Sequence, residues 1–68
     1  MISKNELEWT VYKKVSGEIV GAITSNQSCN VFYFYEFDGN DYKKIGKANT
    51  PVDLEIKYRL NERMGIEV

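Results

Sequence analysis

The chain has 68 residues, of which nine are Lys or Arg, ten are Asp or Glu and none is His, and its formal net charge is −1. This length predicts one small domain covering residues 1–68. The lack of His excludes imidazole-based acid–base catalysis and imidazole metal ligands. A single Cys excludes an internal disulfide and a cysteine zinc cluster, and the five glycines are too isolated for a phosphate-binding loop. We therefore expect no enzyme, no metal site and no cofactor.

Composition and charge predict a folded protein in the cytoplasm. Hydrophobic residues make up 43% of the chain and aromatic residues 13%, which is too rich for a disordered segment. No apolar run approaches the roughly 20 residues that a membrane helix needs. The first residues lack the apolar core of a signal peptide, and a lone Cys suits a reducing compartment. We expect no membrane partner, and the balanced charges disfavour nucleic acid.

Two apolar, strand-like runs flank Ser16-Gly17 and predict the first hairpin. Residues 7–15 alternate between apolar and polar side chains, which is typical of a half-buried strand. Residues 18–24 are apolar on both parities, which indicates a strand covered on both faces. A two-residue turn at Ser16-Gly17 sets the expected pairs. These are Val15 with Glu18, Lys13 with Val20, and Tyr12 with Gly21.

The strongest predicted strand covers residues 30–37, because nearly every side chain from Val31 to Phe37 is β-branched or aromatic. The next four residues, 38–41, have the composition of a turn. Closing this turn predicts a second hairpin with a defined register. The expected pairs are Phe37 with Tyr42, Glu36 with Lys43, Phe34 with Ile45, and Tyr33 with Gly46.

The register of the second hairpin sorts its side chains onto two faces. Phe32, Phe34 and Ile45 carry no polar side-chain atoms, so their face is the expected core. The opposite face is rich in tyrosine, whose apolar ring and polar hydroxyl suit a surface that is wet when free and dry when bound. If both faces are covered instead, as in a small barrel, the tyrosines are core residues. The tyrosine-bearing face holds Val31, Tyr33, Tyr35, Phe37, Tyr42 and Lys44.

The segment 51–64 fits either of two structures. Polar and apolar residues alternate through 53–60, as in a strand. Thr50 as a cap, Pro51 at the first helical position and Gly65 at the end favour a helix, which we prefer. A helix gives an α+β fold, in which two hairpins form a four-stranded antiparallel sheet with a C-terminal helix. A strand gives an all-β, five-stranded SH3-like or OB-like barrel. The helix would pack on the sheet through the ridge of Val52, Ile56, Leu60 and Met64.

These features predict a non-enzymatic binding module that acts through protein–protein interaction. It would be an inhibitor or adaptor that covers a partner's working surface with a tyrosine-rich sheet face, since tyrosine is prominent among the residues that dominate interface energetics. We expect the contact residues to be Tyr12, Tyr33, Tyr35, Tyr42 and Lys44.

Two other functions use the same residues. In the first, the rings stack on bases of single-stranded nucleic acid while Lys43, Lys44 and Lys47 follow its backbone. The balanced charge of the chain disfavours that alternative. In the second, two copies form a homodimer through the tyrosine-bearing face or through an exposed strand edge.

Overall fold

The computed structural model describes residues 6–65, with only the backbone at residues 8 and 9. The polar start of the chain, on which the expectation of no signal peptide depends, lies largely outside this range. Within it, the elements follow in the order β1 (Leu7–Lys13), β2 (Ile19–Ser25), β3 (Phe32–Phe37), β4 (Tyr42–Ala48), α1 (Pro51–Lys57) and α2 (Leu60–Met64).

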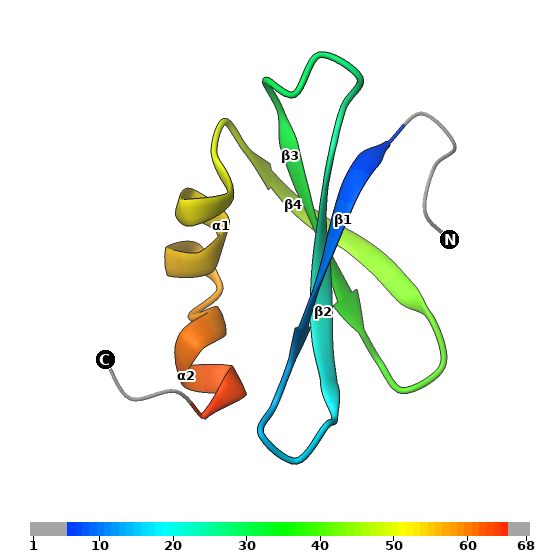
Figure 1. The fold of residues 1–68 in the computed structure, drawn as a ribbon, viewed down its shortest axis with the longest axis vertical. Helices are drawn as coiled ribbons and strands as arrows, with labels where there is room; N and C mark the ends of the chain where they lie inside the picture. Colours follow the sequence, from blue (N-terminus) through cyan, green and yellow to red (C-terminus); the bar gives the residue numbers. More distant parts are fainter. Residues whose placement is uncertain (1–5, 66–68) are drawn as a thin grey trace.

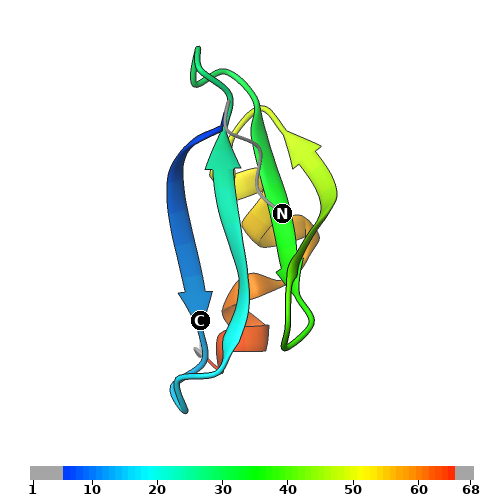
Figure 2. The ribbon, with the colours of Figure 1, turned by 90° about the vertical axis from the view of Figure 1, so that its right-hand side faces the viewer.

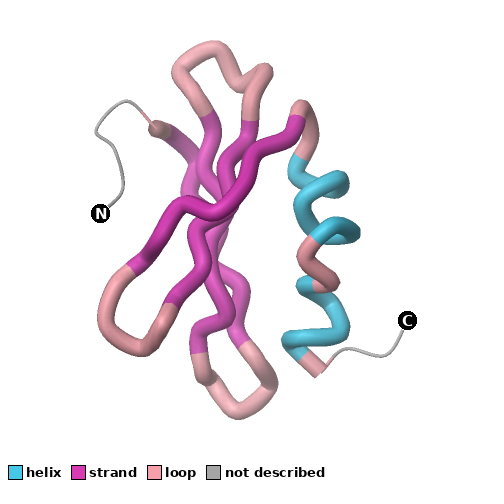
Figure 3. The backbone as a smooth tube through the Cα atoms, turned by 180° about the vertical axis from the view of Figure 1, so that it is seen from behind, coloured by secondary structure: helices cyan, strands magenta, loops and turns pink. Residues whose placement is uncertain are grey.

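The four strands form one twisted antiparallel sheet in the order β1-β2-β3-β4 (Figure 1). Both helices lie along one side of this sheet, one after the other (Figure 3). The predicted α+β fold is therefore confirmed. The alternative barrel is wrong, because residues 51–57 and 60–64 are helical and do not form a fifth strand.

The core lies between the helices and the face of the sheet that carries Phe34. Leu54 of α1 and Leu60 of α2 are buried with Ile23 of β2 and Phe34 of β3. The ring of Tyr58, between the two helices, stacks on the ring of Phe34 with their centroids 4.8 Å apart. Full burial of an aliphatic or phenylalanine side chain contributes roughly 1.5–3 kcal/mol. The four buried residues therefore hold the helices on the sheet, and the Tyr58 ring adds to their contact.

The turn of the first hairpin is one residue longer than predicted. The Lys14 N–H donates to the Glu18 carbonyl at 2.8 Å, and the Gly17 N–H donates to the Lys14 carbonyl at 2.8 Å. Residues 15–17 thus form a three-residue loop, in which Gly17 has a φ of +94° that glycine adopts without strain. The predicted pair of Val15 with Glu18 is wrong, because Val15 lies in the loop.

The register of β1 and β2 is confirmed in the middle of the hairpin, where Tyr12 pairs with Gly21, but it shifts again between Leu7 and Thr10. A bulge then intervenes, and Lys13 pairs with Ile19 rather than with Val20. The bulge leaves Val20 outside the pairing, and its side chain is buried in the core cluster. The expectation of a strand covered on both faces is also confirmed, since β2 is buried from Val20 to its end.

The register of the second hairpin is confirmed near its turn and wrong beyond it. A bulge in β4 places Phe34 opposite Gly46 instead of Ile45, and Tyr33 opposite Lys47 instead of Gly46. Ile45 is 40% exposed, so its assignment to the core is wrong. The confirmed pairs are Phe37 with Tyr42, and Glu36 with Lys43.

The bulge has a physical reason in the packing of Tyr58. A Cβ added at Gly46 would collide with the Tyr58 hydroxyl, so Gly46 is the residue of β4 over which this ring fits. The same hydroxyl donates to the backbone carbonyl of Ile45 at 3.1 Å. Placing Gly46 opposite Phe34 therefore makes room for the ring that joins helix and sheet.

The helical segment begins and ends as predicted but is divided in two. Thr50 accepts a hydrogen bond from the Asp53 N–H at 3.2 Å, with Pro51 in the first turn. Gly65 ends α2 with a φ of +83°. Between the helices, Arg59 adopts a left-handed conformation with a φ of +52°, which interrupts the regular helix.

The predicted ridge is right in α2 and wrong in α1. Val52 and Ile56 are 57% and 71% exposed, so they face away from the sheet. Leu54 is buried in their place and Tyr58 packs beside it. Beyond the break, the contacts with the core come from Leu60 and Met64, as expected.

Candidate functional site

The face of the sheet that points away from the helices carries most of the predicted contact residues. Figure 2 looks onto the sheet with both helices behind it. The observed register aligns Tyr35 with Ala22 and Lys44, and Phe37 with Tyr42. Tyr33 lies two residues before Tyr35 on β3, so it shares this face. We call the surface formed by Tyr33, Tyr35, Phe37, Tyr42 and Lys44 the tyrosine face.

A carboxylate that the sequence did not point to lies on this face. Glu6, immediately before β1, accepts hydrogen bonds at Oε2 from the Tyr35 hydroxyl at 2.6 Å and the Thr24 hydroxyl at 2.7 Å. Its Oε1 lies 2.7 Å from Lys44 Nζ. The side chain of Glu6 is 5% exposed, against 44% for Lys44. One carboxylate thus contacts three strands, and we call these four residues the Glu6 cluster.

Lys44 also contacts the aromatic rings of the tyrosine face. Its Nζ lies 4.2 Å from the centroid of the Tyr33 ring and 5.5 Å from that of Tyr35. An ammonium in this position is attracted by the electron-rich ring face. Lys44 is therefore held by Glu6 on one side and by Tyr33 on the other.

The protonation states in the Glu6 cluster follow from its contacts. Burial raises the pKa of Glu6, but the hydrogen bonds from Lys44, Tyr35 and Thr24 outweigh burial and hold that pKa below its ordinary value. The hydrogen bond to Glu6 raises the pKa of Lys44, while burial and the same carboxylate raise the pKa of Tyr35. At neutral pH the cluster is an ion pair with a neutral phenol as donor.

The predicted contact residues differ in how accessible they are. Tyr35 is only 2% exposed, so its ring and hydroxyl belong to the structure of the face. Tyr33 and Tyr42 are half-buried and Lys44 is exposed. The ring of Phe37, which was not among the predicted contact residues, lies 4.8 Å from that of Tyr42 at an interplanar angle of 48°. These four residues supply the accessible part of the surface.

Tyr12 is not brought together with the other predicted residues. It aligns with Gly21 on the face that meets the helices, and its hydroxyl donates to Glu55 Oε2 of α1 at 2.9 Å. Burial and the hydrogen bond to Glu55 raise the pKa of Tyr12. Tyr12 therefore joins the two layers, on the opposite side of the sheet from Tyr33.

Sequence reasoning missed Glu6 and Thr24. Lys44 among tyrosines indicates that an acid lies nearby, but ten Asp and Glu residues could have supplied it. Thr24 lies opposite Tyr33 in the β2–β3 register. The sequence predicted pairs within each hairpin but none between β2 and β3, because their register depends on the loop that joins them.

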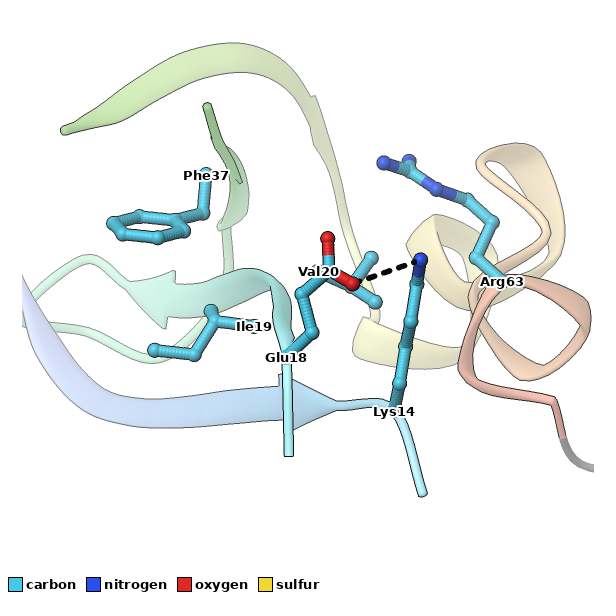
Figure 4. A pocket seen from close by; sticks show the side chains of 6 residues that line it. All are labelled: Lys14, Glu18, Ile19, Val20, Phe37 and Arg63. Carbon is cyan, nitrogen blue, oxygen red and sulfur yellow. Dashed lines mark hydrogen bonds and ion pairs between the residues drawn. The ribbon is translucent and has the colours of Figure 1, made fainter. Parts of the chain in front are cut away.

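A hollow lies near the turn of the first hairpin, where Phe37 of the tyrosine face is one of its lining residues (Figure 4). The two cations that line it have acidic partners. Lys14 Nζ lies 3.4 Å from Glu18, and the guanidinium of Arg63 lies 3.3 Å from Glu36. The hollow therefore offers less unmatched charge than its two basic residues suggest.

Other classes of site find little support in the part of the chain that the structure describes. There, no three carboxylate or thiol groups gather in a way that could hold a metal ion. No helix in the same part has the length and apolar character needed to cross a bilayer. Comparisons with protein-family models, with curated proteins and with solved structures find no match to this chain. The tyrosine face is therefore interpreted from its own geometry.

Proposed function

We propose that this protein is a non-enzymatic binding module that docks a protein partner on the tyrosine face. The observation that supports this is the arrangement of Tyr33 and Lys44, with Phe37 and Tyr42 beside them, on the sheet face opposite the helices. Aromatic rings with polar edges are enriched in protein interfaces and carry much of their binding energy.

The rigidity of this surface favours binding. Lys44 is held between the Glu6 carboxylate and the Tyr33 ring, and Phe37 contacts Tyr42 across the strand pair. A partner would therefore have to immobilise few additional side chains, and each one costs about 0.5–1.5 kcal/mol on binding. We expect the protein to act as a cytoplasmic inhibitor or adaptor that covers its partner's working surface.

The alternatives are less favoured. The bulge in β4 and the irregular register of β1 disturb both edges of the sheet, and such edges pair poorly with a second copy. A homodimer would therefore use the tyrosine face itself. Single-stranded nucleic acid remains the second candidate because Lys44 lies over the Tyr33 ring, but Glu6 already neutralises that lysine.

The test compares capture of a partner from untreated and from nuclease-treated host extract by immobilised wild-type protein and by two sets of variants. Tyr33→Ala and Tyr42→Ala change the tyrosine face, whereas Val52→Ala and Ile56→Ala change the exposed side of α1. We expect the first set to weaken binding of the captured protein at least about tenfold, which corresponds to about 1.4 kcal/mol. The second set should bind like wild type, and far-UV circular dichroism should show all four folded.

Two outcomes would contradict this function. The first is a loss of binding in the α1 variants with none in the tyrosine-face variants. The second is binding that depends on nucleic acid, shown by its loss on nuclease treatment and by a steep fall in affinity with salt. Weak dependence of affinity on salt would agree with a protein partner.

A further inference from the structure

The donors of the Glu6 cluster form a site whose shape suits a carboxylate. Tyr35 and Thr24 donate hydroxyls to one oxygen, at 2.6 and 2.7 Å, and Lys44 contacts the other oxygen at 2.7 Å. The three donors belong to β3, β2 and β4, which are neighbours in the sheet. The acceptor, Glu6, lies outside the strands. The site is therefore built by the sheet, and its occupant comes from the position directly before β1.

The burial of these groups also supports a site for a carboxylate. Thr24 and Tyr35 are 1% and 2% exposed, and the described side chains contain no buried polar atom without a partner. Without Glu6, the two buried hydroxyls would need another acceptor, because leaving buried polar groups unpaired is costly, and the exposed Lys44 ammonium would lose its carboxylate partner. A second carboxylate would satisfy all three donors at once.

We propose that Thr24, Tyr35 and Lys44 form a carboxylate-binding site that Glu6 occupies within the chain, and that an acidic side chain of a protein partner binds there in its place. The identity of the ligand as part of a protein rests on the proposed function, whereas the carboxylate site does not. The half-buried ring of Tyr33, which contacts Lys44, provides an apolar surface for the stem of the incoming Asp or Glu.

Because Glu6 occupies the site, a free carboxylate has to compete with it for the three donors. A group attached by a short segment acts at an effective concentration of about millimolar or more, so it weakens the apparent affinity for any free carboxylate. Removing the Glu6 side chain should therefore raise the affinity for a small carboxylate, although it also removes a stabilising contact. A gain in affinity would show that the three donors, once Glu6 is removed, bind a free carboxylate.

The experiment titrates acetate into isotope-labelled protein at constant ionic strength and follows backbone amide shifts. We expect Glu6→Ala to bind acetate at least about tenfold more tightly than wild type, with the largest shifts at Thr24, Tyr35 and Lys44. The control is Glu62→Ala, which removes an exposed carboxylate from α2 and should bind acetate like wild type. Adding Lys44→Ala to Glu6→Ala should abolish the gain, whereas adding Lys43→Ala, a neighbouring lysine of β4, should preserve it.

The proposal is overturned if Glu6→Ala gains no affinity over wild type, if the shifts centre elsewhere, or if inorganic phosphate binds more tightly than acetate. If Glu6→Ala does not fold, Glu6→Gln takes its place, because its amide keeps the shape of the side chain without the charge. That variant should gain at least about threefold, and no gain overturns the proposal. A failed capture experiment on the tyrosine face would contradict the proposed function alone, since acetate binding does not depend on the partner.

Discussion

The carboxylate of Glu6 joins β2, β3 and β4 on the face of the sheet that the helices leave open. Its three contacts are charge-assisted, and such hydrogen bonds contribute about 1.5–3 kcal/mol each when they are well made. The contact with Lys44 contributes less, because that ammonium is half exposed and is screened by solvent. Glu6 is therefore expected to stabilise the fold mainly through Tyr35 and Thr24.

This contact predicts a specific loss of stability in acid. The folded pKa of Glu6 lies below its ordinary value of 4.5, so the stabilisation is complete above pH 4.5 and is lost as pH falls through the folded pKa. Glu6→Gln should be about 1–3 kcal/mol less stable than wild type at pH 7. Urea denaturation at pH 7, 5, 4 and 3 should show this difference shrinking below about pH 4.5.

Comparing the stability of wild type with that of Glu6→Gln separates the contribution of Glu6 from the contributions of the other acids. Asp38, whose pKa is lowered by backbone hydrogen bonds from Asp41 and Asn40, should lose its own contribution in acid in both proteins. A difference in stability that stays constant down to pH 3 would contradict the assignment of Glu6 as an ionised acceptor.

The residues of the tyrosine face were predictable, but the residue that organises them was not. Alternation along β3 places Tyr33, Tyr35 and Phe37 on one side whatever the rest of the fold does. Glu6 lies 29 residues before Tyr35 and outside any periodic pattern. Its position depends on how the chain enters β1, which no local preference determines.

Among the elements, the helical segment shows how a pattern can predict a helix and still assign the wrong face. Val52, Leu54, Ile56, Tyr58 and Leu60 alternate with polar residues, so two apolar i, i+4 ridges run along α1. The ridge of Leu54 and Tyr58 faces the sheet because the Tyr58 ring fits over Gly46 and stacks on Phe34. The contact with β4 therefore determines which ridge packs on the sheet, and the pattern of the helical segment carries no information about that strand.

The two ridges can be compared directly by matched truncations. Leu54→Ala should destabilise the protein by about 2–5 kcal/mol, because it opens a cavity in the core. Ile56→Ala removes a side chain that is 71% exposed and should cost less than about 1 kcal/mol. Thermal or urea unfolding of both variants measures the difference, and equal losses would contradict the observed orientation of α1.

In the strands, too, the sequence predicted only part of the register. In each hairpin the register holds over several pairs and then shifts. The first hairpin shifts near its turn and again between Leu7 and Thr10, and the second shifts at Ile45 in β4. Turn composition and pairing preferences predicted the pairs that local contacts determine. The bulge at Ile45 depends on a helix packed on the sheet, so the sequence of the hairpin could not reveal it.

At the scale of the whole molecule, polar contacts as well as the core join the two layers. The Tyr12 hydroxyl contacts Glu55, the Tyr58 hydroxyl contacts the carbonyl of Ile45, and Arg63 contacts Glu36. The helices are too short to be stable alone in water, since isolated helices need about 12–15 residues even in favourable sequences. Sheet and helices should therefore fold as one unit.

This coupling predicts coincident unfolding transitions. Urea curves measured by far-UV circular dichroism and by aromatic fluorescence should share one midpoint and one slope. Leu60→Ala, which changes only α2, should lower both midpoints equally and should cost about 2–5 kcal/mol. An early loss of helical signal, with the fluorescence transition unchanged, would show that the layers unfold separately.

The fit between Gly46 and Tyr58 has a consequence for sequences related to this one. A side chain at position 46 and a large ring at position 58 exclude each other, because the space that one needs is filled by the other. In chains that share this fold, the two positions should therefore vary together, with glycine opposite an aromatic residue or a larger residue opposite a small one. Such covariation would identify distant relatives even where the rest of the sequence has diverged.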